Sequence, residues 1–369
     1  MIVAKTRGTI HVFDNYHQEE KKMTDQNAGA AAKHEVPPEG QIMQLMMGGF
    51  IAQAVYVAAK LGIADLLASG ERTAADLAAA TQTDERSLYR LLRALASLGV
   101  FTETSDRTFA NTPMSETMLA DSPTSMRAML LMVGDPEHGR VINDLEYSVR
   151  TGKPAWKHVH GVPVFKYFFE TNKELGDIFN QAMTSGSHAQ IAAVLASFDF
   201  AGIGTLADIA GGHGHLLGGI MQKYPSMKGV LFDLGVVLAG APEMLASYGV
   251  ANRVQLVEGD FFSEIPVVAD AYILKHIIHD WYDDKCEKIL GCIRRSMPDD
   301  GRVLIVDSVI PSGNDPHPGK LLDLEMLIAP GGVERTAAEF ETLLTNSGFR
   351  LNRIIPTPSP VSIVEAVKA

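Results

Sequence analysis

The chain has 369 residues, of which 46% are hydrophobic and 21% are charged, the composition of a globular protein long enough for two or three domains. Its formal net charge of −12 argues against a protein that binds nucleic acid, which normally needs a basic surface. Two cysteines, Cys286 and Cys292, exclude a disulfide framework. The N-terminus lacks a secretory signal and no uninterrupted apolar run approaches a membrane span, so we expect a cytoplasmic protein with no membrane partner.

The N-terminal region begins with a segment that has no regular pattern. Residues 1–38 mix polar and charged side chains and predict a flexible tail, in which Met23 is a second candidate for the natural start. Between Gln41 and Leu67 apolar residues recur at helical spacing, interrupted by Gly48-Gly49 and Gly62. This spacing predicts two or more buried helices.

A compact pattern follows and predicts a winged-helix domain over residues 39–125. Thr73 can cap a helix over 74–80, and Thr83 or Asp84 can cap a second helix over 85–98. Residues 100–103 and 108–110 then form two short strands around a polar turn. Such a fold raises the alternative of a transcription regulator, whose recognition helix would carry Arg86, Arg90 and Arg93. The acidic net charge weakens that alternative, and a solvated or dimer-facing surface explains the arginines more simply.

The remaining two thirds of the chain predict an α/β domain. Residues 126–200 are mostly helical, whereas short apolar strands alternate with helices after residue 201. The strands are buried on both faces, as parallel strands are, and their spacing is that of βα units in a doubly wound sheet. The last two segments predict an antiparallel hairpin at the sheet edge. The predicted strands are 205–210, 228–233, 254–259, 269–275, 302–309, 349–356 and 362–366.

The most informative segment is the loop after the first strand, from Asp208 to Leu216. Small residues there let the backbone approach a ligand and leave N–H groups free. A dinucleotide site needs a third glycine where Leu217 stands, and a Walker loop needs a Gly-Lys pair that is absent. The alternative is the glycine loop of S-adenosylmethionine (SAM) enzymes, with Asp208 for the amino group of the cofactor. A glycine turn without any ligand remains a further interpretation.

Two more acids end the next two strands. Asp233 ends the second strand, where a carboxylate can bind both ribose hydroxyls of a nucleoside cofactor. Asp260 follows the third strand and can accept a hydrogen bond from adenine, while Phe261 packs against the ring. Either aspartate alone can be explained as a turn or cap residue. Three acids at three successive strand ends, beside a glycine loop, favour a cofactor site.

His279 follows the fourth strand, at the edge of the sheet where doubly wound folds bind ligands. Imidazole titrates near neutrality and is the usual general base. Asp307 ends the fifth strand and Glu334 lies further on, and either acid can hold the ring of His279 in one tautomer. His276 and His279 also raise the alternative of a metal site. Their spacing is not that of zinc proteases and no third ligand is evident, so we expect no metal.

Several segments in order resemble the motifs of class I SAM-dependent O-methyltransferases of the caffeic acid, hydroxyindole and bacterial polyketide type. The resemblance covers about residues 40–369. It implies a winged-helix domain that serves dimerisation, a Rossmann-like catalytic domain over 126–369 with helices of the acceptor pocket in 126–200, and a homodimer. The segments are 208–214, 232–234, 259–262, 274–281 and 331–336.

The resemblance also implies roles for individual residues. It places SAM on the glycine loop and the strand-end acids, together with Lys275, and makes S-adenosylhomocysteine (SAH) the product. It makes His279 the general base, flanked by Asp307 and Glu334. The implied cofactor residues are Asp208, Gly211, Gly212, Gly214, Asp233, Asp260, Phe261 and Lys275, and the implied acceptor residues are Met183, Phe179, His276, Asp280 and Glu325.

Three positions depart from the family pattern. Ala210 stands for a glycine of the loop, His276 for the tryptophan of the plant enzymes, and Asp307 for a glutamate.

The resemblance as a whole implies methylation of a hydroxyl on an aromatic or polyketide-type molecule, in secondary metabolism. N-methylation, or decarboxylation or hydroxylation by a SAM-binding relative, remains an alternative.

Overall fold

The computed structural model describes residues 36–122 and 125–369, with the side chains of 186–189 excepted. The predicted tail therefore lies almost wholly outside the described residues. The chain divides into two compact units, 1–138 and 139–369, and each is described here by itself. Our boundary between functional domains, after residue 125, stays a prediction.

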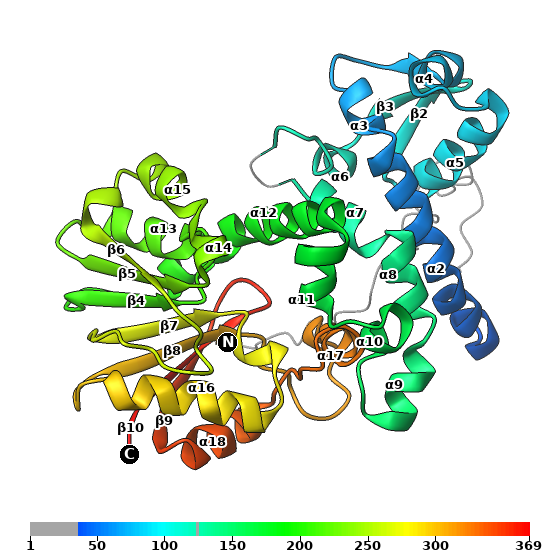
Figure 1. Cartoon of the computed structure of the whole chain (residues 1–369). Helices are drawn as coiled ribbons and strands as arrows, with labels where there is room; N and C mark the ends of the chain where they lie inside the picture. Colours follow the sequence, from blue (N-terminus) through cyan, green and yellow to red (C-terminus); the bar gives the residue numbers. More distant parts are fainter. Residues whose placement is uncertain (1–35, 123–124) are drawn as a thin grey trace, which may run out of the picture. The chain divides into compact units, whose positions relative to one another are not determined.

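The first unit contains the predicted helix, turn, helix and hairpin (Figure 1). Thr73 caps α4 (Ala74–Thr81) and Asp84 caps α5 (Glu85–Ser97), each by accepting a backbone N–H. The hairpin strands β2 (Phe101–Ser105) and β3 (Thr108–Asn111) pair with each other, and β3 also pairs with a third short strand, β1 (Arg72–Thr73), in the order β1-β3-β2. The winged-helix prediction is confirmed for the described residues. The unit also includes α3 (Ile63–Leu66), α6 (Pro113–Glu116) and α7 (Arg127–Val133).

The prediction of two or more buried helices between Gln41 and Leu67 is confirmed in number, because α3 follows a first helix there, but the predicted burial is wrong for most of that first helix. One helix, α2 (Pro38–Lys60), runs through Gly48-Gly49, and only its last residues are buried. A glycine inside a helix costs only about 1 kcal/mol relative to alanine, which is too little to end one. The first half of α2 exposes large apolar side chains instead: Ile42, Met43, Leu45, Met46, Met47 and Phe50.

By length and composition alone, α2 is also long and apolar enough to cross a membrane, the one such helix found among the described residues. Our expectation of no span rested on uninterrupted apolar runs, and polar residues such as Gln41 and Gln44 hide this helix from that criterion. Helices that do not span a membrane also meet these two criteria, so a single such helix does not define a span.

The second unit is built on a seven-stranded sheet in the order β6-β5-β4-β7-β8-β10-β9 (Figure 1). The first five strands in this order are parallel, and β10 pairs antiparallel with both β8 and β9. The predicted doubly wound sheet and its edge hairpin are thereby confirmed. The strands are β4 (Thr205–Ile209), β5 (Lys228–Asp233), β6 (Val254–Glu258), β7 (Ala271–Lys275), β8 (Arg302–Asp307), β9 (Phe349–Pro356) and β10 (Ser362–Lys368).

Helices cover both faces of this sheet, as Figure 1 shows for α13 and α16. Alternate strand residues supply two cores, because neighbouring side chains of a strand point to opposite faces. Ala207 and Ile209 of β4 pack with α16 and α18, whereas Leu206 packs with α12 and α13. The helices that cover the faces are α12 (Lys173–Ser197), α13 (His215–Lys223), α14 (Gly235–Leu238), α15 (Ala241–Ser247), α16 (Asp283–Ser296) and α18 (Ala337–Asn346).

Residues 139–200 are mostly helical, as predicted, and two of their short helices end where the sequence has glycine. Gly152 and Gly161 follow α9 and α10 with positive φ angles of 65° and 77°, which only glycine adopts without strain. A third core gathers around Trp156 and Phe168 and includes Ile328 of α17. The elements are α8 (Pro136–Ile142), α9 (Leu145–Thr151), α10 (Ala155–His160), α11 (Val164–Lys166), the π-helical turn Tyr167–Thr171 and α17 (Gly319–Ile328).

Candidate active site

The parallel strands bring the predicted site residues to one edge of the sheet. Asp208 is the second-to-last residue of β4, Asp233 ends β5, Lys275 ends β7 and Asp307 ends β8. Parallel strands present their carboxyl ends at the same edge, which is where open α/β sheets bind ligands. Residues far apart in sequence are thus brought together as predicted.

The loop after β4 requires its glycines. A Cβ atom at Gly211 would overlap the carboxyl carbon of Asp208 and would lie 2.6 Å from Leu231. Gly212 and Gly214 have φ angles of +62° and +83°, and the amide of Gly212 donates to Asp233 over 2.8 Å. Ala210, which replaces the usual glycine, also has a left-handed φ of 55°. An L-residue in that conformation costs roughly 1–2 kcal/mol, so Ala210 stores strain in the loop.

Asp208 lies beneath this loop and is buried. Burial raises the pKa of its carboxyl to about 7, with nearby Lys275 acting in the opposite direction. Its Oδ2 atom has no hydrogen-bond partner among the described residues. Burial disfavours the charged form of Lys275 as well, and therefore lowers the pKa of this cation. The ammonium of Lys275 donates to Gln190 of α12 over 3.5 Å.

The two remaining acids serve local turns. Asp233 accepts hydrogen bonds from the amides of Gly212 and Leu234, and burial raises its pKa. Asp260 is exposed and accepts from the amide of Phe262 over 2.8 Å, the turn role that the sequence left as an alternative. Phe261 packs edge-on against Phe262, with ring centroids 4.7 Å apart.

The hydrogen-bond acceptors and the free space at these residues fit SAM. The unpartnered, buried oxygen of Asp208 suits an ammonium group, and the glycine backbone leaves space that any side chain would fill. The carboxylate of Asp233 keeps lone pairs for hydroxyl donors beside the two amides that it accepts from.

His279 lies in a short 3-10 turn, Ile278–Asp280, and its ring is buried. Its Nδ1 atom is 2.7 Å from Oε1 of Glu334, which is also buried. The neutral ring therefore donates Nδ1–H to Glu334 and keeps the lone pair of Nε2 for an incoming proton. The sequence left the choice between Asp307 and Glu334 open, and the hydrogen bond goes to Glu334.

Carboxylates surround this imidazole. Burial acts to lower the pKa of His279, but Asp307, Asp280 and Glu334 outweigh it and raise the pKa to about 9. Asp280 is the nearest to the free nitrogen, with Oδ1 3.6 Å from Nε2. Burial also raises the pKa of Asp280 to about 6 and that of Asp307 to about 7. The positive ring is stabilised in this site more than the neutral one.

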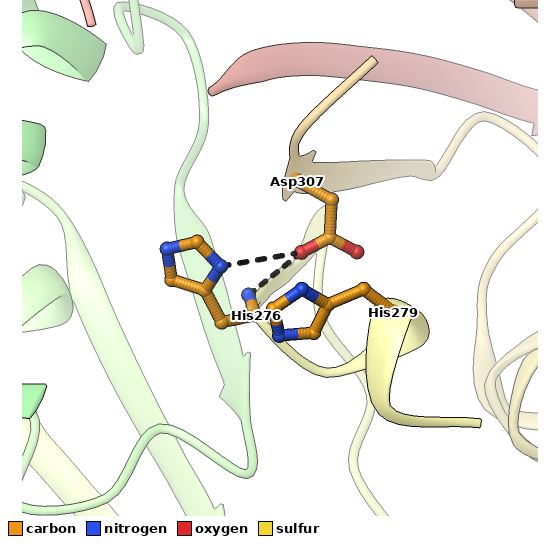
Figure 2. A group of neighbouring side chains, drawn as sticks. All are labelled: His276, His279 and Asp307. Atoms are coloured by element: carbon orange, nitrogen blue, oxygen red, sulfur yellow. Dashed lines mark hydrogen bonds and ion pairs between the residues drawn. The ribbon is translucent and has the colours of Figure 1, made fainter. Parts of the chain in front are cut away.

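His276 has an unusual backbone, with a φ of 56°. Its amide donates to Oδ1 of Asp307 over 2.9 Å, and its ring lies against that of His279, with centroids 4.9 Å apart (Figure 2). The Nε2 atom is 3.1 Å from Oε1 of Gln190 and donates to it. Burial lowers the pKa of His276 well below its usual range, and the neighbouring Lys275 and His279 lower it further.

Sequence reasoning missed two residues that hold the histidine turn. The buried guanidinium of Arg335 donates to the carbonyls of Ile278 and Trp281, on either side of His279, over 3.1 and 2.9 Å. Asp323 accepts the amide of Glu334 over 2.7 Å. The position of Arg335 next to Glu334, in the segment 331–336, was the available signal for the first of these, whereas nothing in the sequence marks Asp323. Nor does anything in the sequence mark Gln190, the partner of His276.

The predicted acceptor residues lie in three places. Phe179 stacks on Phe168 with centroids 5.0 Å apart, and Phe165 lies between Phe179 and Trp281 at 6.1 and 6.5 Å. His276 and Asp280 touch His279 directly. Met183 and Glu325 are both half-buried, on α12 and α17.

The doubly wound sheet, its glycine loop and the acids at its strand ends define a Rossmann-like, SAM-dependent methyltransferase. A family model described as the O-methyltransferase domain matches residues 142–350, and one described as the O-methyltransferase dimerisation domain matches residues 43–121. The chain belongs to this O-methyltransferase family.

Known relatives support the assignment. A phenazine O-methyltransferase of Lysobacter antibioticus is 41% identical over 344 residues, which is 93% of this chain and 99% of the relative. The 8-amino-8-demethylriboflavin N,N-dimethyltransferase of Streptomyces davaonensis is 39% identical over 85% of this chain and 91% of the relative. A methyltransferase of calicheamicin biosynthesis, crystallised with SAH, superposes with a TM-score of 0.80 at 39% identity over 89% of this chain and 97% of that chain.

Proposed function

We propose that this enzyme methylates a hydroxyl group of an aromatic small molecule in secondary metabolism, with His279 as the general base. The observation that carries the proposal is the 2.7 Å hydrogen bond between His279 Nδ1 and Glu334, buried at the carboxyl edge of the sheet. It fixes the tautomer that leaves Nε2 free to take a proton. Relatives named for phenazine and mitomycin O-methylation support an aromatic acceptor.

The cofactor supplies an electrophilic methyl group on a sulfonium. In our proposal the glycine loop (Gly211, Gly212 and Gly214) and Lys275 hold it, with Asp208 at its ammonium, Asp233 at its ribose, and Asp260 and Phe261 at its adenine. His279 takes the hydroxyl proton while the oxygen attacks. Asp307 and Glu334 stabilise the imidazolium that forms, because opposite charges within about 4–6 Å favour the charged ring.

We propose that the aromatic ring of the acceptor binds against Phe179, Trp281 and Met183. Offset or edge-on aromatic contacts hold a planar ring without fixing its substituents. His276 and Asp280 lie beside the base, and Glu325 adds a half-buried carboxylate on α17 for a polar group of the acceptor. This arrangement accounts for an enzyme that accepts a flat, partly polar molecule.

We further propose that the enzyme is a cytoplasmic homodimer. The exposed apolar side chains of α2 belong to the segment matched by the dimerisation domain, from residue 43 onward. Contiguous exposed apolar surface of this kind marks an interaction site. A second copy of the chain is the partner that explains it without a membrane or nucleic acid.

N-methylation is the second candidate, because one of the relatives named above is an N,N-dimethyltransferase. An amine needs less help from a base than a hydroxyl does. Tandem mass spectrometry of the product locates the added methyl group on oxygen or on nitrogen.

The test of the base is His279→Ala. We expect SAM affinity within about twofold of wild type and turnover lower by about 10²–10⁴, the usual contribution of a general base. His158→Gln, an exposed histidine outside the site, is the matched control and should leave both unchanged. Turnover that survives in His279→Ala would contradict the assignment.

A further inference from the structure

A cluster of three donor groups lies at the histidine turn. One nitrogen of His276, one of His279 and a carboxylate oxygen of Asp307 all lie within 4.8 Å of one another (Figure 2). Sequence reasoning set a metal aside because no third ligand was evident. Asp307, which β8 places beside the two histidines, is a third candidate ligand.

The hydrogen bonds of the cluster leave lone pairs facing each other. His276 donates Nε2–H to Gln190, so its Nδ1 atom carries a lone pair. That atom lies 3.8 Å from Oδ1 of Asp307, which accepts the backbone amide of His276. Nδ1 of His276 and Oδ2 of Asp307 are buried without a hydrogen-bond partner among the described residues. A buried acceptor without a partner costs free energy, which a cation bound beside it would recover.

His279 completes this arrangement. Because Glu334 holds its Nδ1–H, the Nε2 atom is the available donor, as in histidine ligands that a carboxylate orients from behind. Asp280, with Oδ1 3.6 Å from Nε2, adds negative charge beside the cluster. Lys275 and Arg335 are the cations that act on these acids.

We propose that His276, His279 and Asp307 form a binding site for a divalent transition metal ion of the zinc class, whose occupancy blocks methyl transfer. Two imidazoles and one carboxylate suit Zn²⁺, Co²⁺ or Ni²⁺ better than Mg²⁺ or Ca²⁺. Bonds of about 2.0–2.2 Å require ligand atoms about 3.4 Å apart, so side-chain rotation must bring the three ligand atoms closer together. The metal-bound Nε2 of His279 has no lone pair for the hydroxyl proton.

The inhibition rests on the proposed role of His279, whereas the metal site does not. Metal binding is therefore measured first and without substrate. Chelator-dialysed enzyme is titrated with Zn²⁺ by calorimetry and with Co²⁺ by visible absorption. We expect one ion per chain, with Co²⁺ bands typical of low coordination number.

The decisive variant is His276→Gln, in which the amide can still reach Gln190 but the Nδ1 ligand is lost. We expect its Zn²⁺ affinity to fall at least about tenfold, and that of Glu334→Gln to fall about 10- to 100-fold, as loss of an outer carboxylate usually does. His158→Gln is the control for exposed histidines and should bind as wild type. Thermal melting of each variant confirms that it is folded.

Zn²⁺ affinity and Co²⁺ bands that do not change in His276→Gln would overturn the site. If the ion binds there as expected but methyl transfer continues undiminished, the inhibitory part is overturned, and with it the role of His279 as the base. If His279→Ala lacks activity and yet Zn²⁺ binds wild type only at other residues, the metal site alone is wrong.

Discussion

Removing the charge of Asp307 tests how the acids tune His279. Asp307→Asn keeps an oxygen to accept the amide of His276, which now donates to Oδ1 over 2.9 Å, but removes a carboxylate that helps to raise the pKa of His279 to about 9. A charge within about 4–6 Å shifts a pKa by about 1–3 units, each worth about 1.36 kcal/mol. Asp307 lies within that range of the ring.

The base must be neutral to act, so kcat/KM for the acceptor should rise with pH and level off above the pKa of His279. In wild type the rise should continue to about pH 9. In Asp307→Asn the rise of kcat/KM should end about 1–3 pH units lower. The plateau value of kcat/KM should also fall, because the imidazolium loses a stabilising charge.

The assay is initial-rate methyl transfer from labelled SAM between pH 6 and 10. Asp299→Asn is the matched control, because Asp299 precedes β8 and is exposed, whereas Asp307 ends that strand. Its profile should match that of wild type. An Asp307→Asn profile that still levels off near pH 9, or at higher pH, would refute the proposed tuning.

Three further changes have defined outcomes. Ala210→Gly should raise the free energy of unfolding by about 1 kcal/mol in urea, because it relieves a left-handed alanine; no gain would mean that the loop is unstrained. Gly211→Ala should weaken SAM binding about tenfold or more by calorimetry, since overpacking costs about 1–3 kcal/mol, while Gly139→Ala, with open space around it, should not. Arg335→Met should destabilise the protein by about 1–3 kcal/mol, because buried carbonyls beside His279 lose their donor, and should lower kcat more than it changes KM.

The sequence predicted the architecture of both units because local patterns carry it. Caps at Thr73 and Asp84 and doubly buried strands such as 228–233 are read directly from neighbouring residues. The extent of α2 was missed because its apolar face has no core of its own to pack against in one chain. The spacing of apolar residues predicts a helix with an apolar face, but it does not show whether that face packs against the same chain or against a partner.

Only part of the site could be predicted from the sequence. Strand-end acids and His279 fall at one edge by topology, so their proximity follows from the fold. His279 bonds to Glu334 and not to Asp307 because the loop before Glu334 passes beside the histidine. There the amide of Val333 donates to the carbonyl of His279 over 2.9 Å. The donor cluster at His276 depends on a left-handed residue that no sequence rule marks.

The central claim is that His279 takes the proton of the acceptor hydroxyl. Its most direct test is the single-turnover rate of methyl transfer in wild type and His279→Ala, measured with acceptors whose hydroxyl pKa values span the assay pH. A base is needed only for a hydroxyl that is still protonated. The rate ratio of wild type to variant should therefore fall from about 10²–10⁴ toward about 1 as the acceptor becomes ionised. A ratio that stays the same for every acceptor would contradict the claim and would leave His279 with a structural role.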